Sequence, residues 1–156
     1  MNEQTLPPRP RYELAHISEI PLSASDDRYG FQLVGEWKQV RHHFGIKEFA
    51  ANAFVATQAG QEIVHTHLEE PNDEQSEVGD EELYYVVSGS AKVKLDDETF
   101  AASAGTFIFV GDPGVVRSVS ADVAGTTILT FGTNPGVDFV VSKFELEMSP
   151  PPRWAS

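Results

Sequence analysis

Two histidines carry the strongest chemical signal in the sequence. His65 and His67 are separated by one residue in the segment GQEIVHTHL. Side chains at positions i and i+2 of a β-strand project from the same face, about 7 Å apart along the backbone. Both imidazoles can then reach one ion at metal–nitrogen distances of about 2.1 Å. Alone, the pair is weak evidence, because neighbouring histidines on an exposed strand are commonly just solvated.

Glu82 strengthens the metal hypothesis. It opens the next apolar segment, EELYYVVSG, and alternates with Tyr84 and Val86, so these three residues share one strand face. A carboxylate here is either a surface cap or a buried group whose charge a cation compensates. Together with the two histidines, Glu82 predicts a divalent-metal site. The chain has no cysteine, so nitrogen and oxygen atoms must bind any such ion.

The segment from Gly60 to Gly89 resembles the first motif of the cupin superfamily: a glycine, H-x-H, a spacer, then a glutamate and six residues to a glycine. The resemblance covers residues 47–132. It implies a small jelly-roll barrel in which the two histidines, the glutamate and a later histidine bind a divalent metal. By residue match, it assigns His65, His67 and Glu82 to that metal.

The spacer between the histidine pair and the glutamate is longer than the usual few residues. Eight acidic residues lie between Glu69 and Glu82, in the run EEPNDEQSEVGDEE. Such a density of like charge is typical of a solvated loop, and loop insertions cost little. The alternative is that Glu69 or Glu70 adds an oxygen ligand to the site.

The second cupin motif is altered. AGTFIFVGDPGVVRSV resembles it, but the turn is one residue longer and Arg117 replaces the histidine. Arginine cannot ligate a cation, because it stays protonated. Strand parity groups Arg117 with Val115 and Val119, which favours an inward side chain, and an inward guanidinium near a metal predicts an anionic substrate between them. Alternatively, the longer turn shifts the register and Arg117 pairs with a surface acid.

Other candidates rank lower. His42 and His43 are adjacent, so only one can face the barrel interior, where it could replace the missing ligand; otherwise both are surface or interface residues. His16 has no partner in sequence. Tyr84 is the aromatic residue expected to reach the ligand cavity. Four phenylalanines are expected to fill the core: Phe54, Phe107, Phe109 and Phe131.

The rest of the chain reads as all-β. Short runs of apolar and β-branched residues alternate with Gly, Asp, Asn and Ser, and no helix-length window shows a 3.6-residue period. Strands so short and numerous must close into a sandwich or barrel to hide their edges, in keeping with a cupin-type double-stranded β-helix (jelly-roll) barrel. The predicted strands cover residues 12–16, 37–44, 47–57, 62–67, 82–88, 91–95, 98–102, 106–110, 115–120, 125–132 and 137–144.

Length and charge set further expectations. The 156 residues predict a single domain with its core at 37–144 and proline-rich tails at 1–11 and 149–156. The net charge is −13 and no Lys or Arg lies between Lys47 and Lys92, which argues against a nucleic-acid partner. With no secretory or membrane-spanning apolar run, a cytoplasmic location and no membrane partner are expected. The apolar segment GVDFVVSKF and the proline tail are expected to support a homodimer.

These features predict a metal-dependent enzyme acting on a small anionic molecule inside the barrel. Two histidines and a carboxylate suit iron, and also zinc, manganese or nickel. Arg117 would orient the anionic group, and Tyr84 would donate a hydrogen bond or act as an acid. The reaction stays open among dioxygenase, isomerase or epimerase, cyclase and lyase chemistry. The alternatives are a non-catalytic ligand-binding or sensing barrel, with or without metal, and a barrel that serves only to dimerise.

Overall fold

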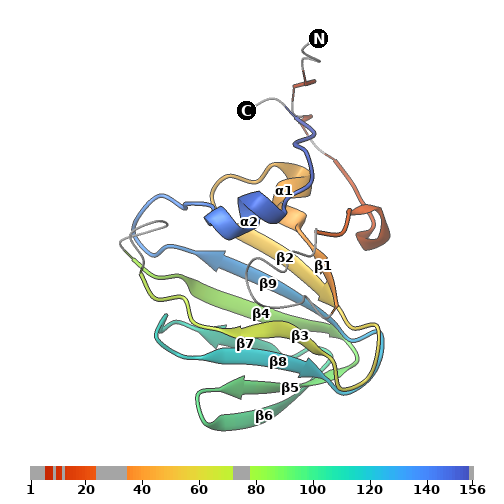
Figure 1. Ribbon diagram of the computed structural model, residues 1–156, viewed down its shortest axis with the longest axis vertical. Coiled ribbons are helices and arrows are strands. Elements are labelled where there is room, and N and C mark those ends of the chain that lie inside the picture. The colour runs from red at the N-terminus through yellow and green to blue at the C-terminus, as the bar shows by residue number, and fades with distance from the viewer. Residues whose placement is uncertain (1–5, 9, 12, 24–34, 72–77, 155–156) are drawn as a thin grey trace.

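The computed structural model describes residues 6–8, 10–11, 13–23, 35–71 and 78–154, the side chain of Phe144 excepted. Its strands form two antiparallel sheets that face each other (Figure 1). The first sheet has the order β1 (Glu36–Lys38), β2 (Ala50–Val55), β9 (Thr127–Thr133), β4 (Glu81–Ser88) and β7 (Phe107–Val110). The second has the order β3 (Glu62–His67), β8 (Arg117–Ala121), β5 (Ser90–Leu95) and β6 (Glu98–Ser103). The predicted all-β fold is confirmed.

The chain crosses from the first sheet to the second at Gly89, between β4 and β5. Gly89 has φ +75°, and a Cβ at this position would lie 2.4 Å from Thr126 Oγ1. The turn therefore requires glycine, both for its backbone conformation and for lack of space. Thr126 in turn donates from Oγ1 to the carbonyl of Ser90 at 3.1 Å, which fastens the start of β5.

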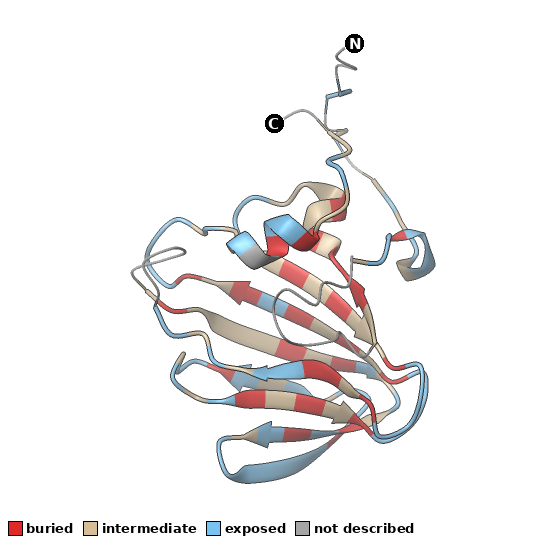
Figure 2. Ribbon diagram, viewed as in Figure 1, coloured by how far each residue is buried: buried red, intermediate tan, exposed pale blue. Residues whose placement is uncertain are grey.

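The hydrophobic core lies between the two sheets. Buried residues alternate with more exposed ones along most strands (Figure 2), as expected when one face of each strand points inward. Val86 and Ile128 are fully buried at the centre of the first sheet. The buried core cluster consists of Ala56, Ile63, Val64, Tyr84, Val86, Ala91, Val93, Ala102, Val110, Val119, Ala121 and Ile128.

Three of the four phenylalanines expected in the core lie on the surface instead. They are Phe107, Phe109 and Phe131, with exposed fractions of 65%, 61% and 39%. The segment FIFV is apolar at every position, so the sequence does not show which parity faces inward, and Ile108 and Val110 take the inner positions. Phe54 does pack against the core.

Two predicted strands are wrong, and a third, 37–44, is a strand only at residues 37–38, in β1. Residues 13–16 precede a short 3-10 helix, η1 (Ile17–Glu19), and residue 12 lies outside the described residues. Of residues 37–44, the last five form helix α1 (Val40–Phe44), which ends at Gly45 with φ +64°. Residues 137–142 are not a strand and lead into α2 (Lys143–Met148), whose N-cap is Ser142. Helices this short cannot display a 3.6-residue period in sequence.

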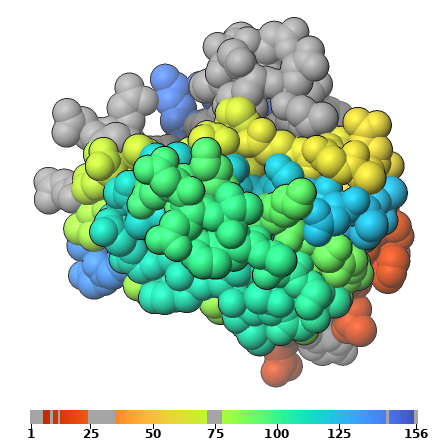
Figure 3. Space-filling model, turned by 90° about the horizontal axis from the view of Figure 1, so that it is seen from below, coloured from red at the N-terminus to blue at the C-terminus, as the bar shows by residue number. Residues whose placement is uncertain are grey.

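The two α-helices lie side by side at the β1–β2 end of the first sheet (Figure 1). Arg41 Nε donates to Glu145 Oε1 at 2.6 Å, and both side chains are buried. Gln39 donates to the Glu145 carbonyl at 3.5 Å. Seen from below, the molecule presents mainly the green and teal part of the chain, which holds β5 to β8 (Figure 3). No helix within the described ranges has the length and apolar character needed to cross a membrane.

Candidate functional site

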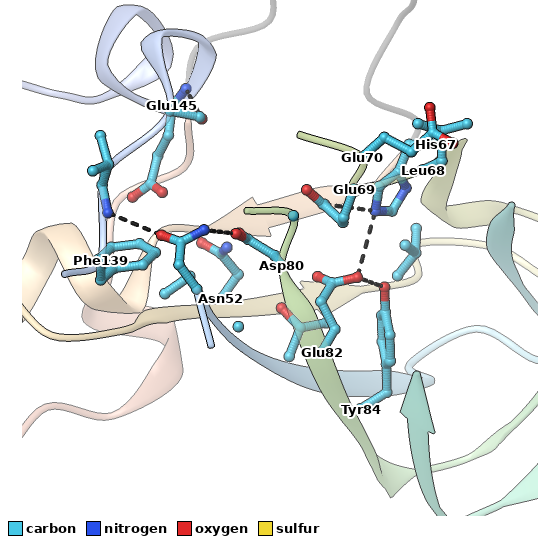
Figure 4. Close-up of a pocket in the computed structure, with 18 of the residues that line it drawn as sticks. Asn52, His67, Leu68, Glu69, Glu70, Asp80, Glu82, Tyr84, Phe139 and Glu145 are labelled. Atoms are coloured by element: carbon cyan, nitrogen blue, oxygen red, sulfur yellow. Dashed lines mark hydrogen bonds and ion pairs between the residues drawn. The ribbon is translucent and has the colours of Figure 1, made fainter. Parts of the chain in front are cut away.

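A cavity of about 410 Å³ opens between β3, β4 and the neighbouring strands. This is within the range of small-molecule sites. Its wall combines aromatic, amide and acidic side chains, several of which are shown in Figure 4. The lining includes Trp37, Asn52, Phe54, His65, His67, Glu69, Glu70, Asp80, Glu82, Tyr84, Thr130, Asn134, Phe139, Val140 and Glu145.

Strand β3 does not alternate regularly where it carries the two histidines. Its pairing with β8 shifts register between Glu62 and Val64 and again between Val64 and His67. His67 therefore turns toward Glu82, whereas the His65 side chain is 46% exposed and its Nδ1 lies 3.7 Å from Glu62 Oε1. His65 still lines the cavity. The irregular pairing explains why two residues with i, i+2 spacing differ in their surroundings.

Within the described residues, the side chains that converge as a possible metal-ligand group are His67, Glu69 and Glu82. Their ligand atoms all lie within 4.8 Å of one another. His67 Nε2 lies 3.2 Å from Glu69 Oε1 and 3.6 Å from Glu82 Oε2 (Figure 4). His67 Nδ1 lies 2.6 Å from the carbonyl of His65 and, because a carbonyl only accepts, carries the proton. Nε2 is thus the nitrogen that meets the carboxylates.

Glu82 is held by two further groups. The Tyr84 hydroxyl, two residues along β4, donates to Glu82 Oε2 (Figure 4). Arg117 Nη1 donates to the same oxygen at 3.0 Å. Burial of Tyr84 and the neighbouring Glu82 charge raise the pKa of the tyrosine well above its usual value. Tyr84 therefore stays protonated and acts as a donor.

Arg117 points inward from β8 and is 2% exposed. Besides its bond to Glu82, its Nε donates to the carbonyl of Val115 at 3.0 Å. Its Nη2 donates to the carbonyls of Asp112 and Pro113 at 3.2 and 3.1 Å. Arg117 is not among the described residues that line the cavity. Its expected contact with an anionic substrate stays a prediction, and its observed contact is with Glu82.

The pKa values of His67, Glu82 and Asp80 are shifted by burial and by the charged groups that lie close together at the site. Burial alone lowers the pKa of His67, but hydrogen bonds with Glu69 and Glu82 outweigh it and raise this pKa to about 10. Burial opposes ionisation of Glu82, yet its contacts with His67, Tyr84 and Arg117 hold its pKa below the usual value. Burial raises the pKa of Asp80 to about 7, and the charges of Glu69 and Glu82 add to the shift.

His16, His42 and His43 do not line this cavity. His43 is buried in α1, where its Nε2 lies 2.9 Å from Arg153 Nη1. Burial, followed by the Arg153 charge, lowers the pKa of His43. His42 is also in α1, so the expected strand position of both is wrong. His16 caps η1 by accepting from the Ser18 amide at 3.3 Å.

Several cavity residues were not predicted from the sequence. Asn134 donates to the carbonyl of Val78 at 3.3 Å and to the Asp80 carboxylate, which joins β9 to the chain before β4. Its carbonyl accepts from the Val140 amide at 3.1 Å and so holds the segment of Phe139 against the cavity. An asparagine following a strand gives no such signal in sequence. Phe139 and Val140 belong to the segment expected to form a dimer surface.

No protein-family model and no curated protein sequence matches the chain. Solved structures do. An RmlC-like cupin from Shewanella frigidimarina is 17% identical with a TM-score of 0.54, over 82% of this chain and 96% of that one. A double-stranded β-helix protein from Klebsiella pneumoniae is 12% identical with a TM-score of 0.57, over 85% and 99%.

A third structure, from Acidithiobacillus ferrooxidans, is provisionally named a sugar phosphate isomerase. It is 21% identical with a TM-score of 0.53, over 64% of this chain, and the match spans 59% of that chain's length. Identities this low establish the fold alone. The chain is a cupin-fold protein, a double-stranded β-helix, as the motif around His67 and Glu82 predicted.

The group of His67, Glu69 and Glu82 fits a divalent cation. One imidazole nitrogen and two carboxylate oxygens are a donor set that zinc, manganese and iron accept. The His67 Nδ1 contact with a backbone carbonyl is the outer-shell arrangement typical of ligating histidines. Burial is the main cause of the raised pKa of Asp80, and the negative charges of Glu69 and Glu82, which a cation would offset, add to it.

Proposed function

We propose that this cupin binds a divalent metal through His67, Glu69 and Glu82 and acts as a metal-dependent enzyme on a small organic molecule in the adjoining cavity. The observation that carries the proposal is the convergence of three ligand atoms within 4.8 Å on the cavity wall. When bound, such an ion supplies Lewis acidity to a coordinated substrate oxygen. The reaction class stays open among those that cupins perform.

The remaining side chains have assignable roles. Tyr84 fixes the orientation of Glu82 through its hydroxyl. Trp37, Phe54 and Phe139 offer apolar surface for the carbon skeleton of a ligand and exclude water from the cavity. Asn52 accepts from the Trp37 indole at 3.0 Å, which fixes both side chains in the wall.

The charge of the lining bears on the substrate. Five carboxylates line the cavity, those of Glu69, Glu70, Asp80, Glu82 and Glu145, and no Lys or Arg does so among the described residues. The anionic ligand expected from the sequence would thus find its positive partners in the metal and the histidines. On this proposal, binding of an organic anion requires the metal.

Metal analysis of the untagged protein tests the proposal. We expect about one equivalent of a divalent metal, and less than about one-tenth would refute the metal-dependent enzyme. His67→Ala should abolish binding. Glu69→Ala and His65→Ala then separate the two ligand sets, because the convergent group predicts loss with Glu69→Ala, whereas the motif resemblance predicts loss with His65→Ala.

A metal-free binding barrel is the second candidate. Arg117 and a protonated His67 already balance the charges of Glu69 and Glu82. A metal must displace the His67 proton, and a pKa of about 10 makes this cost about 4 kcal/mol at neutral pH. Thermal-shift screening in the presence of a chelator tests this candidate, because ligands that stabilise the chelated protein would support it.

A further inference from the structure

One carboxylate oxygen of Glu82 contacts three other side chains. Its Oε2 accepts from Arg117 Nη1 at 3.0 Å and from the Tyr84 hydroxyl, and it lies 3.6 Å from His67 Nε2. The Arg117 side chain is only 1% exposed. A fixed positive charge is therefore in direct contact with a carboxylate of the candidate metal-ligand group.

Arg117 has little freedom to move away from this carboxylate. Three backbone carbonyls, those of Asp112, Pro113 and Val115, accept from its Nε and Nη2 at 3.0–3.2 Å. A buried guanidinium would lose these bonds on leaving, and unpaired buried donors are costly. Its charge is permanent, because arginine does not deprotonate in proteins. The cation thus stays beside Glu82 whether or not another ion is present.

We propose that Arg117 is a built-in competitor for Glu82 that weakens divalent-ion binding and thereby sets the metal affinity of the site. The inference rests on the proposed function for the ligand set of His67, Glu69 and Glu82. Two cations that share one carboxylate in a poorly hydrated site repel each other strongly, and each lowers the benefit that the other gains from the anion. The site then binds metal less tightly than the same three ligands would bind it without the arginine.

Arg117 also has a positional role that the experiment must separate from its charge. The carbonyl of Pro113 accepts from Arg117 Nη2 at 3.1 Å and from the Glu69 amide at 2.9 Å. The same turn therefore connects Arg117 to the backbone of Glu69. Any substitution of Arg117 removes hydrogen bonds from the guanidinium to this turn and so disturbs it. The informative comparison is therefore between two variants that both lose the guanidinium but differ in charge.

Arg117→Lys and Arg117→Gln form that pair. Lysine keeps the positive charge and glutamine removes it, while neither can make all of the arginine contacts. Titration calorimetry with Zn²⁺ and with Mn²⁺ measures the affinities. We expect the Gln variant to bind roughly tenfold or more tightly than the Lys variant. Lys94→Gln, on the exposed outer side of β5, changes the net charge equally and should leave metal affinity unchanged.

The outcomes separate this inference from the proposed function. Tighter binding by the Gln variant than by the Lys variant supports the competition, even if the wild type binds no metal. Equal or weaker binding by the Gln variant, with metal bound by the wild type, overturns the competition alone. No binding by any of the three proteins refutes the ligand set and the competition together.

A measurement on the wild type keeps the inference testable if the Gln variant does not fold. Nitrogen-15 spectra can follow the Arg117 Nε–H and the His67 imidazole during titration with Zn²⁺. We expect both signals to shift with the same midpoint, because Arg117 and the ion share Glu82. A titration that moves His67 and leaves Arg117 unmoved overturns the proposal.

Discussion

The hydroxyl of Tyr84 donates to the carboxylate of Glu82, two residues earlier on strand β4. Both side chains face the cavity, and Arg117 donates to the same carboxylate oxygen from the opposite sheet. The contact between Arg117 and Glu82 thus connects the two sheets at the site, as does the contact between His67 and Glu82. Glu82 is oriented by the protein before any ligand binds.

Tyr84→Phe should weaken the fold by about 2 kcal/mol, because the buried Glu82 carboxylate loses one of its donors. Chemical denaturation measures the loss. Tyr85→Phe is the matched control: this neighbouring tyrosine faces the other side of β4 and packs against Phe107, with ring centroids 4.4 Å apart. The Tyr85→Phe variant should change the free energy of unfolding by no more than about 0.5 kcal/mol. Equal effects of the two variants would contradict the role assigned to Tyr84.

Metal binding should release about one proton near neutral pH. In the metal-free protein His67 is protonated, with a pKa raised to about 10, and Nε2 must lose its proton to ligate. Calorimetric titration with Zn²⁺ in two buffers of different ionisation enthalpy counts the protons released. His65→Ala should leave the count unchanged. Metal binding without proton release would show that His67 Nε2 is not a ligand.

Asp80→Asn should stabilise the chelated protein at about pH 8 more than at about pH 5. The pKa of Asp80 rises from 3.8 to about 7 on folding, through burial first and then the charges of Glu69 and Glu82. A raised pKa gives stability that is complete below about pH 4 and lost as the pH rises through 7. Asparagine still accepts from Asn134 but cannot ionise, so it avoids that loss.

The measurement is the melting temperature across this pH range. Asp122→Asn, in an exposed turn, should show no comparable trend. A gain for Asp80→Asn that does not change with pH would exclude titration of this carboxyl as its cause.

Gly89→Ala should destabilise the fold more than Gly105→Ala. Both glycines have positive φ, +75° and +91°, a conformation that costs an alanine about 1–2 kcal/mol. Only at Gly89 would the new Cβ also collide, with Thr126, whereas nothing lies within 4 Å at Gly105. Denaturation of both variants measures the difference. Equal losses would mean that the turn between the sheets is less tightly packed than described.

The barrel could be predicted because its evidence is local and repeated. The alternating segments 91–95 and 98–102, both predicted as strands, lie in β5 and β6, which pair antiparallel. Helices α1 and α2 could not be predicted, because contacts between distant residues such as Arg41 and Glu145 hold them in place. Where a strand is apolar on both faces, as in Phe107–Val110, the pattern does not show which face is buried.

The site was predictable only in part. His67 and Glu82 lie close together, as the resemblance to the cupin motif implied. The pairing irregularity in β3 gives His65 a different environment, and such irregularities leave no trace in the H-x-H pattern. Glu69 was an alternative ligand among eight acids. It joins the group because its amide bonds to the Pro113 carbonyl, a contact between residues 44 positions apart.

That same contact has a consequence for how the chain can diverge. The Glu69 amide is tied to Pro113, and the Glu69 carbonyl accepts from the Asp80 amide at 3.1 Å, so the two ends of the acidic segment are pinned to each other. Gly79 closes this junction so tightly that a Cβ there would lie 2.2 Å from the Glu69 carbonyl oxygen. Evolution can therefore lengthen, shorten or rewrite the stretch between the pinned ends while the residues at its base keep their places.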